Sequence, residues 1–110
     1  MRLFCLATTM AVLGGTATEY AAKAQPTGDS ELMAYGEYLA GECTTCHQTK
    51  SSSDGIPAIT GLDTDHFLSA LEAYKDGSRT NATMVSVARS LDAEQMKALA
   101  IYFGSLSPSK

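Results

Sequence analysis

The sequence predicts an all-α domain, on two observations that agree along the chain. Apolar residues recur at helical spacing in several segments, and most of these segments begin with a residue that commonly caps a helix. No segment of useful length beyond residue 24 alternates between apolar and polar residues as a half-buried strand does. The length of 110 residues suits a single domain, and no internal repeat or low-complexity tract divides it.

The charge balance argues against nucleic acid as a partner. The chain has 8 Lys and Arg against 12 Asp and Glu, for a formal net charge of −4. Affinity for phosphate backbones depends on clustered basic residues, which this composition does not favour. Only 18% of the residues are charged, which is too few for a polyampholytic disordered chain, so a small folded unit is expected.

The first 24 residues have the organisation of a secretory signal peptide. A positively charged start precedes an uncharged apolar stretch at residues 3–15, and Ala22-Lys23-Ala24 is a small-x-small cleavage site. The alternative is an uncleaved membrane anchor, but the apolar stretch is too short to span a bilayer. We therefore expect residues 1–24 to be a signal peptide and residues 25–110 to be one exported domain with no membrane span after processing.

The first helix is expected from Ser30 to Glu42, with Asp29 or Ser30 as its N-cap. It leads directly into Cys43. The following segment, Gln48 to Gly61, is rich in Ser, Thr and Gly and contains a proline, so it reads as a loop. The apolar residues of the helix include Leu32, Met33, Tyr35 and Leu39.

A second helix is expected after Asp63 or Thr64, either of which can cap it, and Gly77 stands where its C-terminal stop belongs. A short third helix is expected over about Ala82 to Ser90. Apolar residues recur through the second helix at Phe67, Leu68, Leu71 and Tyr74.

The final helix has the clearest start signal in the chain. Asp92 can cap it, and Gln95, three residues later, can reach back as in a capping box. Its expected buried face consists of Met96, Leu99, Ala100 and Phe103.

Cys43, Cys46 and His47 form a Cys-x-x-Cys-His motif, whereas Cys5 lies within the expected leader. A disulfide is one alternative, but a bridge across two residues constrains the unfolded chain little. A thioredoxin-like redox pair would need a βαβ context. A structural zinc site would need a second pair of ligands, but His66 is the only other histidine and no further cysteine follows residue 24.

The motif is the attachment signal for haem c. Two thiols at this spacing can each add to one vinyl group of a haem. His47 then lies under the ring, where its Nε2 can ligate the iron while the other ring nitrogen donates to a carbonyl. We therefore expect one haem c, held covalently through Cys43 and Cys46.

Spacing alone does not identify the second axial ligand. Met33 and Met96 lie in the apolar stripes of their helices, where a methionine is commonly a core residue. Met84 instead follows a polar segment after the second helix, so its thioether can swing over the open face of the ring. Ligation and core packing both remain open for Met84 at this stage.

The sequence resembles a class I c-type cytochrome over nearly all of residues 25–110. The resemblance implies helices wrapped around one haem, Met84 as the second axial ligand, and a Pro57 carbonyl that accepts from the His47 ring. It also implies a close crossing of the first and last helices. The residues that carry it are Gly36 and Leu39, Gly55-Ile56-Pro57, Met84, and Leu99 with Tyr102.

A narrower likeness is to the haem domains of the cytochrome subunit of flavocytochrome c sulfide dehydrogenases. It implies a periplasmic haem subunit that takes electrons from an FAD-containing sulfide dehydrogenase. The matching residues are Phe67-x-x-Ala70-Leu71-x-x-Tyr74-Lys75-x-Gly77-x-Arg79, then Ala82-Thr83-Met84-x-x-x-Ala88, then Tyr102-Phe103.

These patterns predict transfer of single electrons without catalysis, because a haem with two strong axial ligands has no open iron position. One alternative is a diffusible periplasmic carrier for another oxidoreductase or a terminal oxidase. Others are a haem sensor or enzyme with an open iron site, and a disulfide-bridged binding protein without haem. Lys50, Lys75 and Arg79 are candidates for a docking patch, with solvated surface charges as the alternative.

Overall fold

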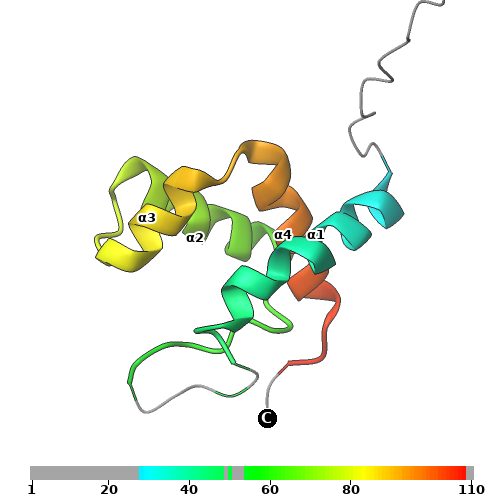
Figure 1. The fold of residues 1–110 in the computed structure, drawn as a ribbon, viewed down its shortest axis with the longest axis horizontal. Coiled ribbons are helices and arrows are strands. Elements are labelled where there is room, and N and C mark those ends of the chain that lie inside the picture. The colour runs from blue at the N-terminus through cyan, green and yellow to red at the C-terminus, as the bar shows by residue number, and fades with distance from the viewer. Residues whose placement is uncertain (1–27, 49, 51–53, 109–110) are drawn as a thin grey trace, which may run out of the picture.

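The computed structural model describes residues 28–48, 50 and 54–108, and in these the chain forms four helices and no strand (Figure 1). The helices are α1 (Asp29–Thr44), α2 (Thr64–Asp76), α3 (Ala82–Ser90) and α4 (Ala93–Ser105). The predicted all-α class is confirmed. The expected signal peptide, residues 1–24, lies outside the described residues. None of the described helices has the length and apolar character needed to cross a membrane.

The starts of α2 and α4 are fixed by side-chain caps, as the sequence predicts. Asp63 accepts a hydrogen bond from the His66 backbone N–H at 3.1 Å, and Asp92 accepts one from the Gln95 N–H at 2.8 Å. Gln95 returns the contact, since its Oε1 accepts from the Asp92 N–H at 3.0 Å to complete the capping box. Gly77 ends α2 in the left-handed conformation, with a φ of 87°.

The prediction that Asp29 or Ser30 caps the start of α1 is wrong. The N-cap is Gly28, which has an extended backbone and whose N–H donates to the Glu31 carboxylate at 3.5 Å. Glycine is accepted at this position, and the early start places two acidic residues, Asp29 and Glu31, in the first turn. There their negative charges stabilise the helix, because they lie at the positive end of the helix dipole.

α1 and α4 cross in backbone contact at Gly36, as the resemblance implies. A Cβ atom built on Gly36 would lie 2.1 Å from the Ala98 carbonyl oxygen and 2.7 Å from the Tyr102 Cβ. No residue with a side chain fits this space without moving one of the helices. The crossing therefore fixes α1, and with it the start of the chain segment that follows α1.

The core is built from α1, α2 and α4. Phe67 and Phe103 stack with ring centroids 5.5 Å apart, and Tyr102 meets Phe103 edge-on at 5.3 Å. α3 is set apart, because α2 is the one helix that it packs against among the described residues (Figure 1). The expected buried face of α4 is confirmed, since Met96, Leu99, Ala100 and Phe103 are all buried.

Met33 differs from its expected place in the core. It is half-buried, because the buried stripe of α1 is narrow and consists of Leu32, Gly36 and Ala40, each four residues from the next. The described parts of the expected loop, residues 48–61, contain no helix or strand. This loop is attached to α4 at its end, where the Gly61 N–H donates to the Phe103 carbonyl at 2.8 Å.

Candidate haem-binding site

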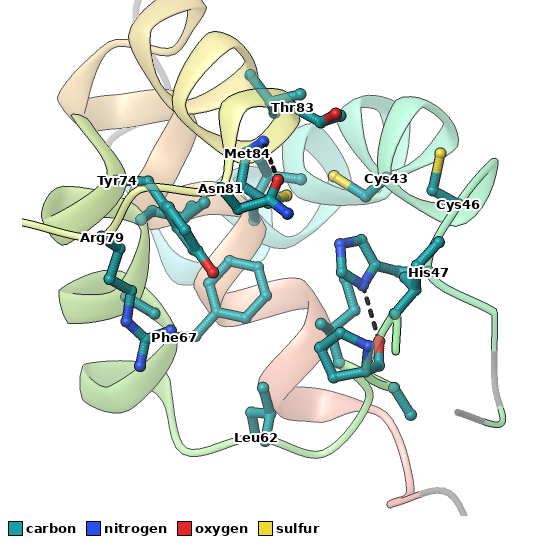
Figure 2. A pocket seen from close by; sticks show the side chains of 18 of the residues that line it. Cys43, Cys46, His47, Leu62, Phe67, Tyr74, Arg79, Asn81, Thr83 and Met84 are labelled. Carbon is teal, nitrogen blue, oxygen red and sulfur yellow. Dashed lines mark hydrogen bonds between the residues drawn. The ribbon is translucent and has the colours of Figure 1, made fainter. Parts of the chain in front are cut away.

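A cavity of about 720 Å³ lies between the C-terminal end of α1, the loop before α2, and helices α2 and α3 (Figure 2). Its volume falls in the range typical of sites for organic ligands and cofactors. The apolar part of the lining is contributed by several elements at once and includes Ile56, Ile59, Leu62, Phe67, Leu71, Val87, Leu91 and Leu99.

The end of α1 brings both cysteines of the motif to this cavity. The N–H groups of Cys46 and His47 both donate to the Cys43 carbonyl, at 3.2 and 2.8 Å, so the chain tightens into a turn as the helix ends. Cys43 is half-buried and Cys46 is exposed, and the two are not joined in a disulfide. The motif thus places two thiols at one edge of the cavity, where both are among its lining residues.

His47 lies on the cavity wall with its ring orientation fixed by a hydrogen bond. Its Nδ1 is 2.7 Å from the Pro57 carbonyl oxygen, the contact that the resemblance implies (Figure 2). A carbonyl can only accept, so Nδ1 carries the proton and donates. The other nitrogen, Nε2, then keeps its lone pair, and Figure 2 shows it turned into the cavity.

Met84 lies across the cavity from His47, in the first turn of α3 (Figure 2). It is half-buried and packs against the core cluster while it also lines the cavity. The Met84 N–H donates to the Asn81 side-chain oxygen at 3.0 Å, which caps α3. Met84 is therefore both a packing residue and a thioether that borders the cavity.

The donor set in this cavity fits a haem. Two thiols lie at one edge, an imidazole nitrogen faces inward from one wall, and a thioether borders the cavity from another, with apolar side chains between them. Within residues 28–48, 50 and 54–108, no three His, Cys, Asp or Glu side chains come together to hold a metal ion by themselves. The arrangement suits a planar apolar group with a central metal.

Burial is the main cause of a shift in the pKa of the Cys43 thiol. It raises the pKa of Cys43 above its ordinary value, and the nearby Glu42 carboxylate raises it further. A raised pKa keeps the sulfur protonated and uncharged at neutral pH. The uncharged thiol suits the apolar surroundings of this edge of the cavity.

The three basic residues considered for docking have different surroundings in the structure. Lys50 and Arg79 are exposed, and the Arg79 guanidinium lies over the Tyr74 ring, 5.4 Å from its centroid. Lys75 is half-buried, and its ammonium donates to the Leu91 carbonyl at the end of α3. Lys75 therefore links α2 to the end of α3.

The sequence analysis missed Asn81, whose side chain caps α3 and lines the cavity. An asparagine directly before a helical segment is a recognisable start signal that could have identified it. His66 is exposed in the first turn of α2, and it also borders the cavity.

Three relatives show what this chain is similar to. It is 40% identical over 73 residues to the cytochrome subunit of sulfide dehydrogenase from Chlorobaculum tepidum, covering 66% of each chain. It is 36% identical over 73 residues to a thiosulfate dehydrogenase electron acceptor from Thiomonas intermedia, covering 64% of this chain and 34% of that one. It is 32% identical over 77 residues to cytochrome c-554(548) from Halomonas halodenitrificans, covering 66% of this chain and 93% of that protein.

The chain thus spans just under two thirds of the sulfide dehydrogenase subunit and about one third of the thiosulfate dehydrogenase acceptor, but nearly all of the Halomonas cytochrome. No family model matches the chain.

Proposed function

The chain belongs to the class I c-type cytochromes, and from that premise we propose that it carries single electrons between redox proteins through one covalently bound haem c. The observation that carries the proposal is the placement of His47 and Met84 across an apolar cavity that has both thiols at its edge. In this proposal Cys43 and Cys46 hold the haem as thioethers, and His47 and Met84 are the axial ligands.

Each of these residues has a distinct task. The bound haem supplies an iron that cycles between two oxidation states. The hydrogen bond from His47 Nδ1 to Pro57 fixes the imidazole and makes Nε2 a stronger donor. A methionine thioether on the other side raises the reduction potential. With His47 and Met84 both bound to the iron, the haem would have no open position for a substrate, which would suit a carrier rather than a catalyst.

The site of action in this proposal is the periplasm. Two sequence features support it: the leader pattern of residues 1–24 and the Cys-x-x-Cys-His motif, since haem c is attached outside the cytoplasm. Residues 25–110 then form the mature domain. This placement puts the cytochrome in the same compartment as exported dehydrogenases.

The proposed electron donor is an FAD-containing sulfide dehydrogenase to which the chain binds as the haem subunit. Support comes from the name and identity of the Chlorobaculum relative. A second candidate is a diffusible electron acceptor of a thiosulfate dehydrogenase, which the Thiomonas relative favours. The two differ in the flavin content of the complex and in the reductant that it uses.

Covalent haem attachment is tested by the intact mass of the protein, produced from the full chain in cells that attach haem c. We expect the mass of residues 25–110 plus one haem, and haem staining that survives a denaturing gel. Cys43→Ser with Cys46→Ser should lose the stain. A wild-type protein without haem stain would contradict covalent haem attachment. A mass that retains residues 1–24 would contradict removal of the signal peptide.

The donor is tested by co-purification from the native periplasm, followed by reduction of the isolated complex. Association with a flavoprotein and haem reduction by sulfide support the haem-subunit role. A flavin-free protein whose haem is reduced in the presence of a thiosulfate dehydrogenase and thiosulfate, but not by sulfide, would replace it with the second candidate.

A further inference from the structure

Met84 lies on the helix that has the least support from the rest of the fold. α3 is 9 residues long, and among the described helices it packs against α2 alone. A helix of this length has little stability by itself, because few of its residues repay the cost of nucleation. The position of Met84 therefore depends on its own packing against the core, on the packing of α3 against α2, and on the hydrogen bonds at the two ends of α3.

Each end of α3 is held by a side chain that lies outside the helix. At the C-terminal end, the Lys75 ammonium from α2 donates to the Leu91 carbonyl. At the N-terminal end, the Asn81 Oδ1 accepts from the Met84 N–H at 3.0 Å. The second contact is made to the backbone of the proposed ligand itself, so it acts on Met84 without any intermediate residue.

The orientation of the Asn81 amide follows from this bond. Its oxygen must face the Met84 N–H, so its nitrogen carries the two remaining donor hydrogens. Asn81 also lines the cavity, and Figure 2 shows its amide between the start of α3 and the side of the cavity that faces His47. One side chain thus joins the cap of α3 to the wall of the cavity.

We propose that Asn81 is the positioning residue for the second axial ligand. Its side chain fixes the first turn of α3 and so holds the Met84 thioether at the cavity, opposite His47. This inference rests on the proposed function, because Met84 must ligate the haem iron for the position of its thioether to matter. Loss of the cap does not remove the Met84 thioether, but it allows the first turn of α3 to move away from the cavity.

The test uses the full-length, haem-loaded protein and four forms: wild type, Asn81→Ala, Asn81→Ser and Asp63→Ala. Serine retains a capping oxygen, whereas alanine removes it. Asp63→Ala is the matched control, because it removes the equivalent cap from α2, where Asp63 accepts from the His66 N–H at 3.1 Å. The readouts are the affinity of the ferric protein for imidazole, which displaces the methionine, and the ε-methyl proton resonance of Met84 in the ferrous protein.

We expect Asn81→Ala to bind imidazole about 5-fold to 10-fold more tightly than the wild type, as the loss of one helix cap predicts. Its Met84 methyl resonance should broaden or shift. Asn81→Ser and Asp63→Ala should both remain within about twofold of the wild-type affinity.

Two results would overturn the inference and are distinguishable from each other. Equal imidazole affinities in Asn81→Ala and Asp63→Ala would remove the positioning role of Asn81 and leave the ligation by Met84 intact. A wild-type protein without a haem-shifted methionine methyl resonance would remove both the ligation and the inference. Should Asn81→Ala not retain haem, Asn81→Gln replaces it, since its longer side chain misplaces the amide, and a wild-type affinity there counts against the proposal.

Discussion

The two proposed axial ligands come from regions of the molecule with very different support. His47 lies three residues beyond the end of α1, which meets α4 in backbone contact at Gly36 and whose buried face belongs to the core. Met84 lies on α3, which contacts α2 alone among the described helices and has a polar hydrogen bond at each end. The side of the cavity that carries His47 is therefore part of the core. The side that carries Met84 is a separate helix that packs against the core through α2.

This difference predicts which contacts can change independently. A change at the α1–α4 crossing alters the stability of the whole domain, because the crossing joins two helices that both supply residues to the core. A change at the ends of α3 should alter the second ligand while most of the core remains folded. The comparison can be tested by substitutions that act on one region at a time.

The largest effect is expected from Gly36→Ala. The new Cβ would lie 2.1 Å from the Ala98 carbonyl oxygen, so α1 and α4 would have to separate. We expect the free energy of unfolding to fall by about 3 kcal/mol or more, which is the upper range for overpacking. Denaturant titration of the haem-loaded protein measures it.

Gly41→Ala is the matched control on the same helix, because a Cβ at Gly41 meets no atom within 4 Å. Alanine is favoured over glycine in a helix, so stability should stay equal or rise by up to about 1 kcal/mol. Equal losses in the two variants would show that the Gly36 contact does not support the domain.

A smaller and more local effect is expected from Lys75→Met. This substitution removes the ammonium that donates to the Leu91 carbonyl but keeps an unbranched side chain in its half-buried place. We expect a loss of about 1.5–3 kcal/mol, as for a hydrogen bond that involves a charged group. Amide hydrogen exchange should show faster opening of α3, with the protection of α4 changed little.

Lys97→Met provides the comparison for Lys75, because Lys97 is an exposed lysine on α4. It should leave the exchange rates of α3 unchanged. Exchange in α3 that is equally fast in both variants, or unaffected in both, would contradict the role assigned to Lys75.

The smallest effect concerns Asp76, at the end of α2. Hydrogen bonds from the Ser78 hydroxyl and from the Ser78 backbone N–H lower the pKa of Asp76. A lowered folded-state pKa gives stability that is fully present above the unfolded-state pKa and is lost as the pH falls through the folded-state value. Asp76→Asn should therefore be slightly less stable than the wild type at pH 7.

The two forms should converge in stability as the pH falls below the folded-state pKa of Asp76. Thermal unfolding at several pH values between neutral and strongly acidic conditions measures the difference. A difference that is independent of pH would show that the charge of Asp76 makes no contribution.

The parts of the fold that could be predicted from the sequence are those fixed by short-range contacts. Asp63 and Asp92 each reach a backbone N–H three residues later, so the two caps were visible in the pattern itself. The N-cap of α1 was not, because Gly28 has no capping side chain and leaves no such signal.

The site was predictable to the same extent. Cys43, Cys46 and His47 are adjacent in sequence, so their motif shows that they act together. Met84 remained open between ligation and packing, because its position depends on how α3 is held. The contact of Lys75 with Leu91 joins residues 16 apart in sequence, and no local pattern distinguishes such a lysine from a solvated one.

The central claim is that His47 and Met84 are the two axial ligands, and the near-infrared absorption of the ferric protein tests it most directly. Met84→Leu keeps the approximate volume of the side chain but cannot ligate, while Met33→Leu replaces a half-buried methionine in α1 that is not a proposed ligand. We predict the band of methionine-ligated haem in the wild type and in Met33→Leu, and its loss in Met84→Leu. A band that persists in Met84→Leu, or a wild-type protein without it, would contradict the claim.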